Sequence, residues 1–286
     1  MATLKEIKGR INSVKSTLKI TSAMKMVASA KLHKAQTAIE GMLPYEQSLK
    51  HTLDELLRQA RLEADIMEQR PLKRVTLVCI SSNSSLCGGF NANVIREARS
   101  RLKALQKAEV EEITVLSVGR KMAESMRKAG FPSPEDFTEL SAKPSYEAAA
   151  ELSDRLVEDF REGRTDRVEL IYNHFVSTAV HKSVCETYLP METPVPAEGE
   201  PSEDEYIIEP DKEELLSVLL PKTLKLKLFT VLLDASAAEH AARTVAMQTA
   251  TDNAEDLLQE LSLEYNKSRQ AKITAEILDL AGGMQE

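Results

Sequence analysis

The sequence contains no tryptophan, and aromatic residues make up only 4% of its 286 residues. All-β folds draw heavily on aromatic and β-branched side chains. This chain is instead rich in alanine, leucine, glutamate and lysine, which are good helix formers. The composition therefore favours long helices over a β-sandwich or barrel.

Cysteines are few, and long apolar runs are missing. Cys79, Cys87 and Cys185 are odd in number and widely spaced, which is not typical of a disulfide framework or a metal site. No segment approaches the roughly 20 uncharged apolar residues of a membrane-spanning helix. The start, MATLKEIKGR, resembles neither a secretory signal nor a transit peptide. We expect a soluble or peripheral protein from a reducing compartment.

Signals for catalysis or cofactor binding are also scarce. The segment LCGGFN, residues 86–91, lies between a predicted strand and a predicted helix, but it lacks the third glycine of a dinucleotide-binding loop and the lysine of a P-loop. The five histidines show no metal-ligand spacing: His33, His51, His174, His181 and His240. The sequence predicts no catalytic site, no metal and no cofactor.

Charge is unevenly distributed within a net charge of -8. The first thirty-odd residues are basic, with one acidic residue, Glu6, among eight lysines and arginines: Lys5, Lys8, Arg10, Lys15, Lys19, Lys25, Lys31 and Lys34. Residues 196–214 are strongly acidic. Without interleaved aromatic residues, the basic segment fits an acidic protein surface better than single-stranded nucleic acid.

The N-terminal segment carries a helical seam. Its apolar residues alternate at steps of three and four, the spacing that packs one helix against another: Leu4, Ile7, Ile11, Val14 and Leu18. We expect a pause near Gly41 and Pro44, and a further helical stretch to about Arg61.

The middle of the chain alternates between strand and helix patterns. Strands are predicted at 74–81, 112–118, 167–175 and 183–189, with helices between the first three. This order predicts a small α/β sheet that is mainly parallel in its first part, because each parallel return needs a crossover.

The C-terminal segment has no glycine or proline between Pro221 and Gly282, so a helix of about 60 residues is predicted. Its seam includes Leu257 or Leu258 and continues through Leu261, Tyr265, Ser268, Lys272, Ile273, Ile277 and Leu280. The two terminal seams can cover each other as an antiparallel coiled coil. The predicted domains are a coiled-coil helix at 1–62, an inserted α/β (Rossmann-like) domain at 70–190, an acidic linker at 191–210 and a second coiled-coil helix at 211–286.

Three motifs resemble one known family. Residues 5–36, with INSVKSTLKITSAMKMV at their centre, look like the N-terminal signature of ATP synthase gamma subunits. Residues 239–280 look like its C-terminal signature, with AMQTATDNA and YNKSRQAKIT in order. LCGGFN is similar to the family's central LCGGLN. Together these motifs resemble the family over the whole chain, while Ser22 and Lys25 depart from its usual ITKAME.

The resemblance implies a non-catalytic rotor of an F-type ATP synthase. The coiled coil would penetrate a ring of three alpha and three beta subunits, and the α/β domain would lie beside the epsilon subunit and the c-subunit ring. Rotation would couple proton movement to ATP synthesis or hydrolysis and help to regulate both. With no transit peptide or plastid-type cysteine insertion, the expected location is the cytoplasmic face of a bacterial inner membrane, as a peripheral subunit.

The resemblance also assigns contact residues by motif position. Contacts with beta subunits are expected at Met24, Lys25, Cys87, Arg243, Arg269, Gln270 and Thr274. Tyr206 and Glu209, in EYIIEPD, are expected to contact the c ring.

Two other functions remain open from the residues alone. A scaffold or tether would use the coiled coil to bind another helix, and would have no need for LCGGFN or YNKSRQ. A small α/β enzyme between helical arms would require a convergent set of catalytic groups, which the sequence does not provide.

Overall fold

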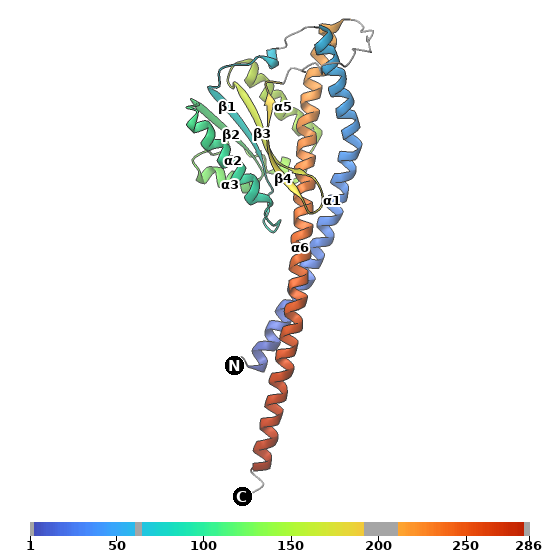
Figure 1. Ribbon diagram of the computed structural model, residues 1–286, viewed down its shortest axis with the longest axis vertical. Helices are drawn as coiled ribbons and strands as arrows, with labels where there is room; N and C mark the ends of the chain where they lie inside the picture. Colours follow the sequence, from blue (N-terminus) through green and yellow to red (C-terminus); the bar gives the residue numbers. More distant parts are fainter. Residues whose placement is uncertain (1–2, 61–64, 192–210, 283–286) are drawn as a thin grey trace, which may run out of the picture.

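Two long helices dominate the computed structural model, which describes residues 3–60, 65–191 and 211–282. Helix α1 spans Leu4–Ala60, and α6 spans Lys212–Gly282, which at 71 residues is roughly 106 Å long. They run side by side in opposite directions, and a small α/β domain lies against the half of the pair farther from the chain ends (Figure 1). This confirms the predicted antiparallel helix pair with an inserted α/β domain.

The register of the two helices is set by apolar burial and by two polar pairs. On α1, Ile7 and Leu53 are almost fully buried. The Thr251 hydroxyl donates to the Thr21 hydroxyl at 2.9 Å, and the Lys25 ammonium donates to the Gln248 side-chain oxygen at 2.7 Å. In these pairs a higher residue number on α1 meets a lower residue number on α6. If this register continues, the start of α1 lies level with about Ser268 of α6.

The last part of α6 therefore extends beyond α1. From Arg269 on, every α6 side chain whose burial is described is exposed, including Ile273 at 47%, Ile277 at 60% and Leu280 at 73%. The expectation that these residues continue a seam buried by the N-terminal helix was wrong. Helix α1 is too short to cover them in this register.

Proline does not interrupt either helix. α1 continues through Gly41 and Pro44, and α6 begins at Lys212 and includes Pro221. The expected pause near Gly41 and Pro44 was wrong. A helix-interior proline costs about 3 kcal/mol, and packing of the flanking turns, through residues such as Leu49 and Leu53, offsets this cost.

The α/β domain is built on a four-stranded sheet of order β2-β1-β3-β4. Its strands are β1 Arg74–Ile80, β2 Glu112–Val118, β3 Arg167–Phe175 and β4 His181–Leu189. β1 pairs in parallel with β2 and β3, and β4 is antiparallel to β3. The mainly parallel first part is confirmed, and β4 starts two residues before its predicted position.

Each face of the sheet is covered by different helices. α2 (Phe90–Lys107) and α3 (Arg120–Lys128) pack on Leu77 and Cys79. α5 (Tyr146–Arg161) and α6 pack on the opposite face, where Leu228 of α6 is fully buried. The short elements η1 (Asp65–Met67) and α4 (Thr138–Ala142) complete the domain. α6 is thus half of the helix pair and also part of the domain's core.

Gly119 connects β2 to α3 in a conformation that a side chain would not tolerate. Its φ is +102°, and a β-carbon there would lie 2.3 Å from the Ser81 carbonyl oxygen. We expect Gly119→Ala to lower the free energy of unfolding by at least about 3 kcal/mol, because it adds a clash to backbone strain. Denaturant unfolding of the purified chain measures this.

The matched control is Gly41→Ala in α1, where a β-carbon would meet nothing within 4 Å. Helix propensity alone predicts a gain of about 0.5–1 kcal/mol. Equal stability of the two variants would contradict the close approach of Gly119 to Ser81.

Candidate functional site

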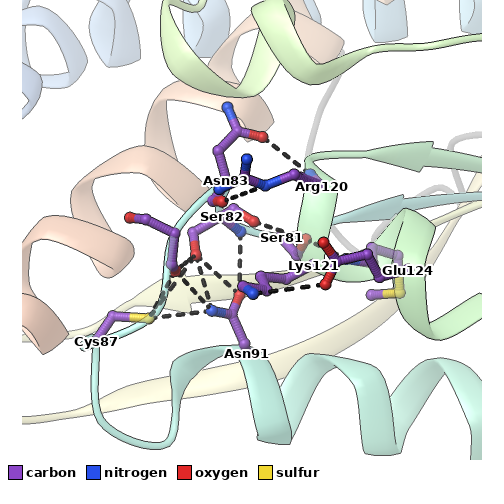
Figure 2. Close-up of polar contacts among 10 residues, drawn as sticks. Ser81, Ser82, Asn83, Cys87, Asn91, Arg120, Lys121 and Glu124 are labelled. Carbon is purple, nitrogen blue, oxygen red and sulfur yellow. Dashed lines mark hydrogen bonds and ion pairs between the residues drawn. The ribbon is translucent and has the colours of Figure 1, made fainter.

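A polar network closes the loop between β1 and α2, residues 81–89 (Figure 2). The Asn91 side-chain amide donates to the Ser82 hydroxyl at 2.8 Å, the Ser84 carbonyl at 3.2 Å and the Cys87 sulfur at 3.2 Å. Its side-chain oxygen accepts the Ser82 backbone N–H at 3.1 Å. Asn91 therefore holds both arms of the loop in one conformation.

The same loop is tied to the rest of the domain by Asn83 and Ser81 (Figure 2). The Asn83 side chain accepts the Arg120 backbone N–H at 2.9 Å and donates to the Thr138 carbonyl at 2.7 Å. The Ser81 hydroxyl accepts the Met122 N–H at 2.8 Å. The side chains of Ser81 and Asn83 thus fix the loop to the first turns of α3 and α4.

Arg243 joins this loop to α6. Its guanidinium donates to the Ser84 hydroxyl at 2.8 Å and pairs with Glu239 one helical turn away. Only 11% of the Arg243 side chain is exposed. Arg243 therefore lies between the helix pair and the loop, and is not a freely exposed charge.

Cys87 is buried beneath the loop, against α6. It is 1% exposed and packs with Phe90, Ala238 and Ala242. Its neighbour Leu86 is 61% exposed and has a φ of +65°. In the folded chain Leu86, rather than the Cys87 thiol, provides the outer surface of this segment.

Met24 and Lys25 lie on α1 in a surface that is unusually apolar. Met24 is half-buried, and Lys25 is bonded to Gln248 of α6. Around them, three α1 side chains are about 60% exposed: Ile20, Met26 and Val27. These three exposed apolar side chains lie within two turns of Met24 and are not covered by α6.

Arg269, Gln270 and Thr274 form a separate group on the extension of α6. All three are exposed, and the Thr274 hydroxyl donates back to the Gln270 carbonyl at 2.9 Å. Arg269 lies roughly 39 Å along the helix from Arg243. The expected contact residues therefore form two groups, one beside the loop and one near the end of α6. Tyr206 and Glu209 fall outside the described residues.

Sequence reasoning missed Ser84, Asn91, Glu239 and Asp234. Asn91 is part of LCGGFN, and its position one residue into α2 was a usable signal for loop capping. Asp234 interrupts an apolar run of α6, an unusual position for a carboxylate. Ser84 and Glu239 carried no comparable signal.

Within the described residues, no cluster of histidine, cysteine or carboxylate side chains could hold a metal ion, and no helix is long and apolar enough to cross a membrane. The arrangement is of a different kind. A long helical stalk carries a side domain, and the candidate residues lie beside the β1–α2 loop and near the end of α6.

Comparisons with known proteins identify this stalk. A family model described as ATP synthase matches residues 3–285. The ATP synthase gamma chain of Phocaeicola vulgatus is 52% identical over 289 residues, covering 99% of both chains. That of Bacteroides thetaiotaomicron is 51% identical over 298 residues, covering 100% of both. The chain belongs to the ATP synthase gamma chain family.

Solved structures share the fold at lower identity. A chain of the Euglena gracilis mitochondrial ATP synthase (OSCP/F1/c-ring, rotational state 3) matches with a TM-score of 0.65 and 22% identity, covering 99% of this chain and 93% of that one. A chain of the Tetrahymena thermophila mitochondrial ATP synthase (central stalk/c-ring) has a TM-score of 0.58 and 22% identity, covering 81% of this chain and 99% of that one.

The Asn91 network predicts the reactivity of Cys87. Asn91→Ala removes the group that joins Ser82, Ser84 and the Cys87 sulfur, so the loop should open more often. We expect a thiol reagent to label Cys87 about tenfold faster or more, as judged by peptide mass spectrometry. Asn93→Ala, on the same helix, is the control, and fully buried Cys79 is an internal reference. Unchanged labelling of Cys87 would show that the network does not hold the loop.

His240 of α6 predicts a pH dependence of stability. Burial, together with the nearby Arg243 and Lys31, lowers the pKa of His240 to about 4. Between that value and about 6.5 the unfolded chain binds a proton that the folded chain does not. Stability should therefore fall, by about 3 kcal/mol from this group, as pH drops from about 6.5 to 4. His240→Gln should flatten this slope in denaturant unfolding, whereas His51→Gln, at an exposed position, should leave it unchanged.

Proposed function

We propose that this chain is the central rotor of an F-type ATP synthase and catalyses no reaction itself. The observation that carries the proposal is the double role of α6. One helix contributes to the core of the α/β domain, pairs with α1 and then extends beyond it. A force applied to the domain therefore reaches the far end of the helix through continuous packed structure.

The proposed partners are three alpha and three beta subunits around the helix pair, and the epsilon subunit and c ring beside the α/β domain. The charge of α1 supports the proposed contact with the ring. The start of α1 is rich in lysine, which suits acidic loops on an enclosing ring. No cofactor is needed for this role, because the work is done by contact between proteins.

Coupling requires the shaft to contact the three beta subunits unequally. A single copy inside a threefold ring has no threefold symmetry of its own, so each beta subunit meets a different face of it. A partner shifts a conformational equilibrium only by its difference in affinity for the states. The asymmetric surface supplies that difference, and turning it would drive each beta subunit in sequence through binding, synthesis and release.

We assign the contact residues to two levels of the shaft. Met24, Lys25 and Arg243, with Cys87 and its exposed neighbour Leu86, form the level beside the loop. Arg269, Gln270 and Thr274 form the level near the end of α6, and the proposed c-ring contacts are Tyr206 and Glu209. The complex would lie at the cytoplasmic face of a bacterial inner membrane, with this subunit peripheral.

The test is reconstitution with alpha and beta subunits of the same organism. Native mass spectrometry should find one copy of this chain with three of each, and the complex should hydrolyse ATP. ATP hydrolysis by this chain alone would contradict the non-catalytic proposal, whereas no association would favour a scaffold or tether.

A double variant tests the assignment at the end of α6. Arg269→Ala with Gln270→Ala should leave the chain folded, because both side chains are exposed. We expect it to weaken coupled proton pumping or assembly several-fold, since charged contacts across an interface are costly to remove. Lys272→Ala, at another exposed position of the same stretch, is the control. Wild-type pumping by the double variant would contradict the assignment.

A further inference from the structure

Asp234 is a mostly buried carboxylate on the side of α6 that faces the α/β domain. Its side chain is 15% exposed. One oxygen accepts the Phe175 backbone N–H at 2.9 Å, and the other lies 2.6 Å from the His174 ring nitrogen Nδ1. Burial raises the pKa of Asp234, so the charged form is held at a cost. These bonds to the end of β3 are what offset that cost.

Phe175, whose N–H is held in this way, lies at the junction of three parts of the molecule. It packs against a buried cluster that α1 and α6 form together, with Leu32 and Ala237 among its members. It also packs against a second cluster, which joins Cys87 of the loop and Phe90 of α2 to α6. A shift of Phe175 would therefore disturb the helix pair and the domain together.

Other polar contacts fix the domain to α6 on either side of Asp234. The Tyr188 hydroxyl of β4 donates to the Leu224 carbonyl at 2.9 Å, and Arg243 donates to the Ser84 hydroxyl at 2.8 Å. Leu224 lies roughly 15 Å from Asp234 along the helix, and Arg243 roughly 14 Å in the other direction. Together with the Lys225–Asp154 and Lys227–Glu186 ion pairs, these attachments along one helix resist both tilting and twisting of the domain.

An apolar residue could not replace Asp234 as an attachment. Leucine or methionine there would fill the space without the cost of burying a charge, and apolar replacement of buried charges is often neutral or stabilising. Neither could accept the Phe175 N–H or orient the His174 ring. The Asp234 carboxylate thus contributes more to the position of the α/β domain on α6 than to the stability of the fold.

We propose that Asp234 is a positioning residue of the rotor, which fixes the end of β3 to α6 so that the α/β domain and the helix pair turn as one body. This inference rests on the proposed rotor function. Asp234 itself contacts no nucleotide and no reacting atom; it acts through the angle at which the domain is held on the shaft.

The experiment measures the angular freedom of the domain in the assembled complex. The alpha/beta ring is fixed to a surface, a probe is attached to the α/β domain, and its angular spread is recorded during pauses in ATP-driven rotation. Asp234→Ala removes both bonds and should widen the angular variance about twofold. Asp234→Asn keeps an acceptor for the Phe175 N–H and should restore most of the wild-type value. Glu151→Ala, which removes an exposed carboxylate from α5, should not change it.

A second measurement uses the purified full chain and does not depend on rotation. In Asp234→Ala the Phe175 amide hydrogen should exchange about tenfold faster or more, while amides in the centre of β1 keep their protection. Faster exchange throughout the domain would overturn the proposal, because Asp234 would then serve general stability. Wild-type angular spread or wild-type Phe175 exchange in Asp234→Ala would also overturn it. Failure of the wild-type complex to rotate would instead count against the proposed rotor function. The exchange of the Phe175 amide would then decide whether Asp234 fixes the end of β3 to α6.

Discussion

The structure depends on one helix, α6, packing against two parts of the molecule. α6 covers a face of the sheet with Leu228 and its neighbours, and it also pairs with α1 through residues such as Ala237 and Ala241. An isolated pair of long helices or an isolated small sheet would each leave an apolar face in water. Because α6 is shared, one helix covers both apolar faces. Each of the two associations is stabilised by about 25 cal/mol per Å² of apolar surface buried.

Small residues make this double burial possible. Ala235, Ala237, Ala238, Ala241 and Ala242 are all buried on α6 at the level of the loop. Their short side chains let α1, the end of β3 and the β1–α2 loop approach the same turns of the helix. Polar side chains then set the geometry, because apolar contacts alone do not specify an angle. Asn91 shapes the loop, and Arg243 and Asp234 connect the domain to the shaft.

The sequence predicted the elements better than the contacts between them. The strands at 112–118 and 167–175 match β2 and β3, because both segments are short and rich in β-branched and aromatic residues. The pause at Pro44 was wrong because tertiary packing overrode a local preference. Periodicity identified the apolar face at Ile273 and Ile277 but could not say whether this chain covers it. The Arg243–Ser84 bond joins residues 159 apart in sequence, and no local pattern encodes such a pair.

The antiparallel pairing of α1 with α6 also has a consequence for biosynthesis. α1 leaves the ribosome first, whereas the turns of α6 that bury Ile7 and Thr21 are among the last parts of the chain to be made. Contacts between such distant segments form late, because the intervening loop must close before they contribute. The seam of α1 therefore stays uncovered by α6 until synthesis is nearly complete, and exposed apolar surface of this kind favours aggregation.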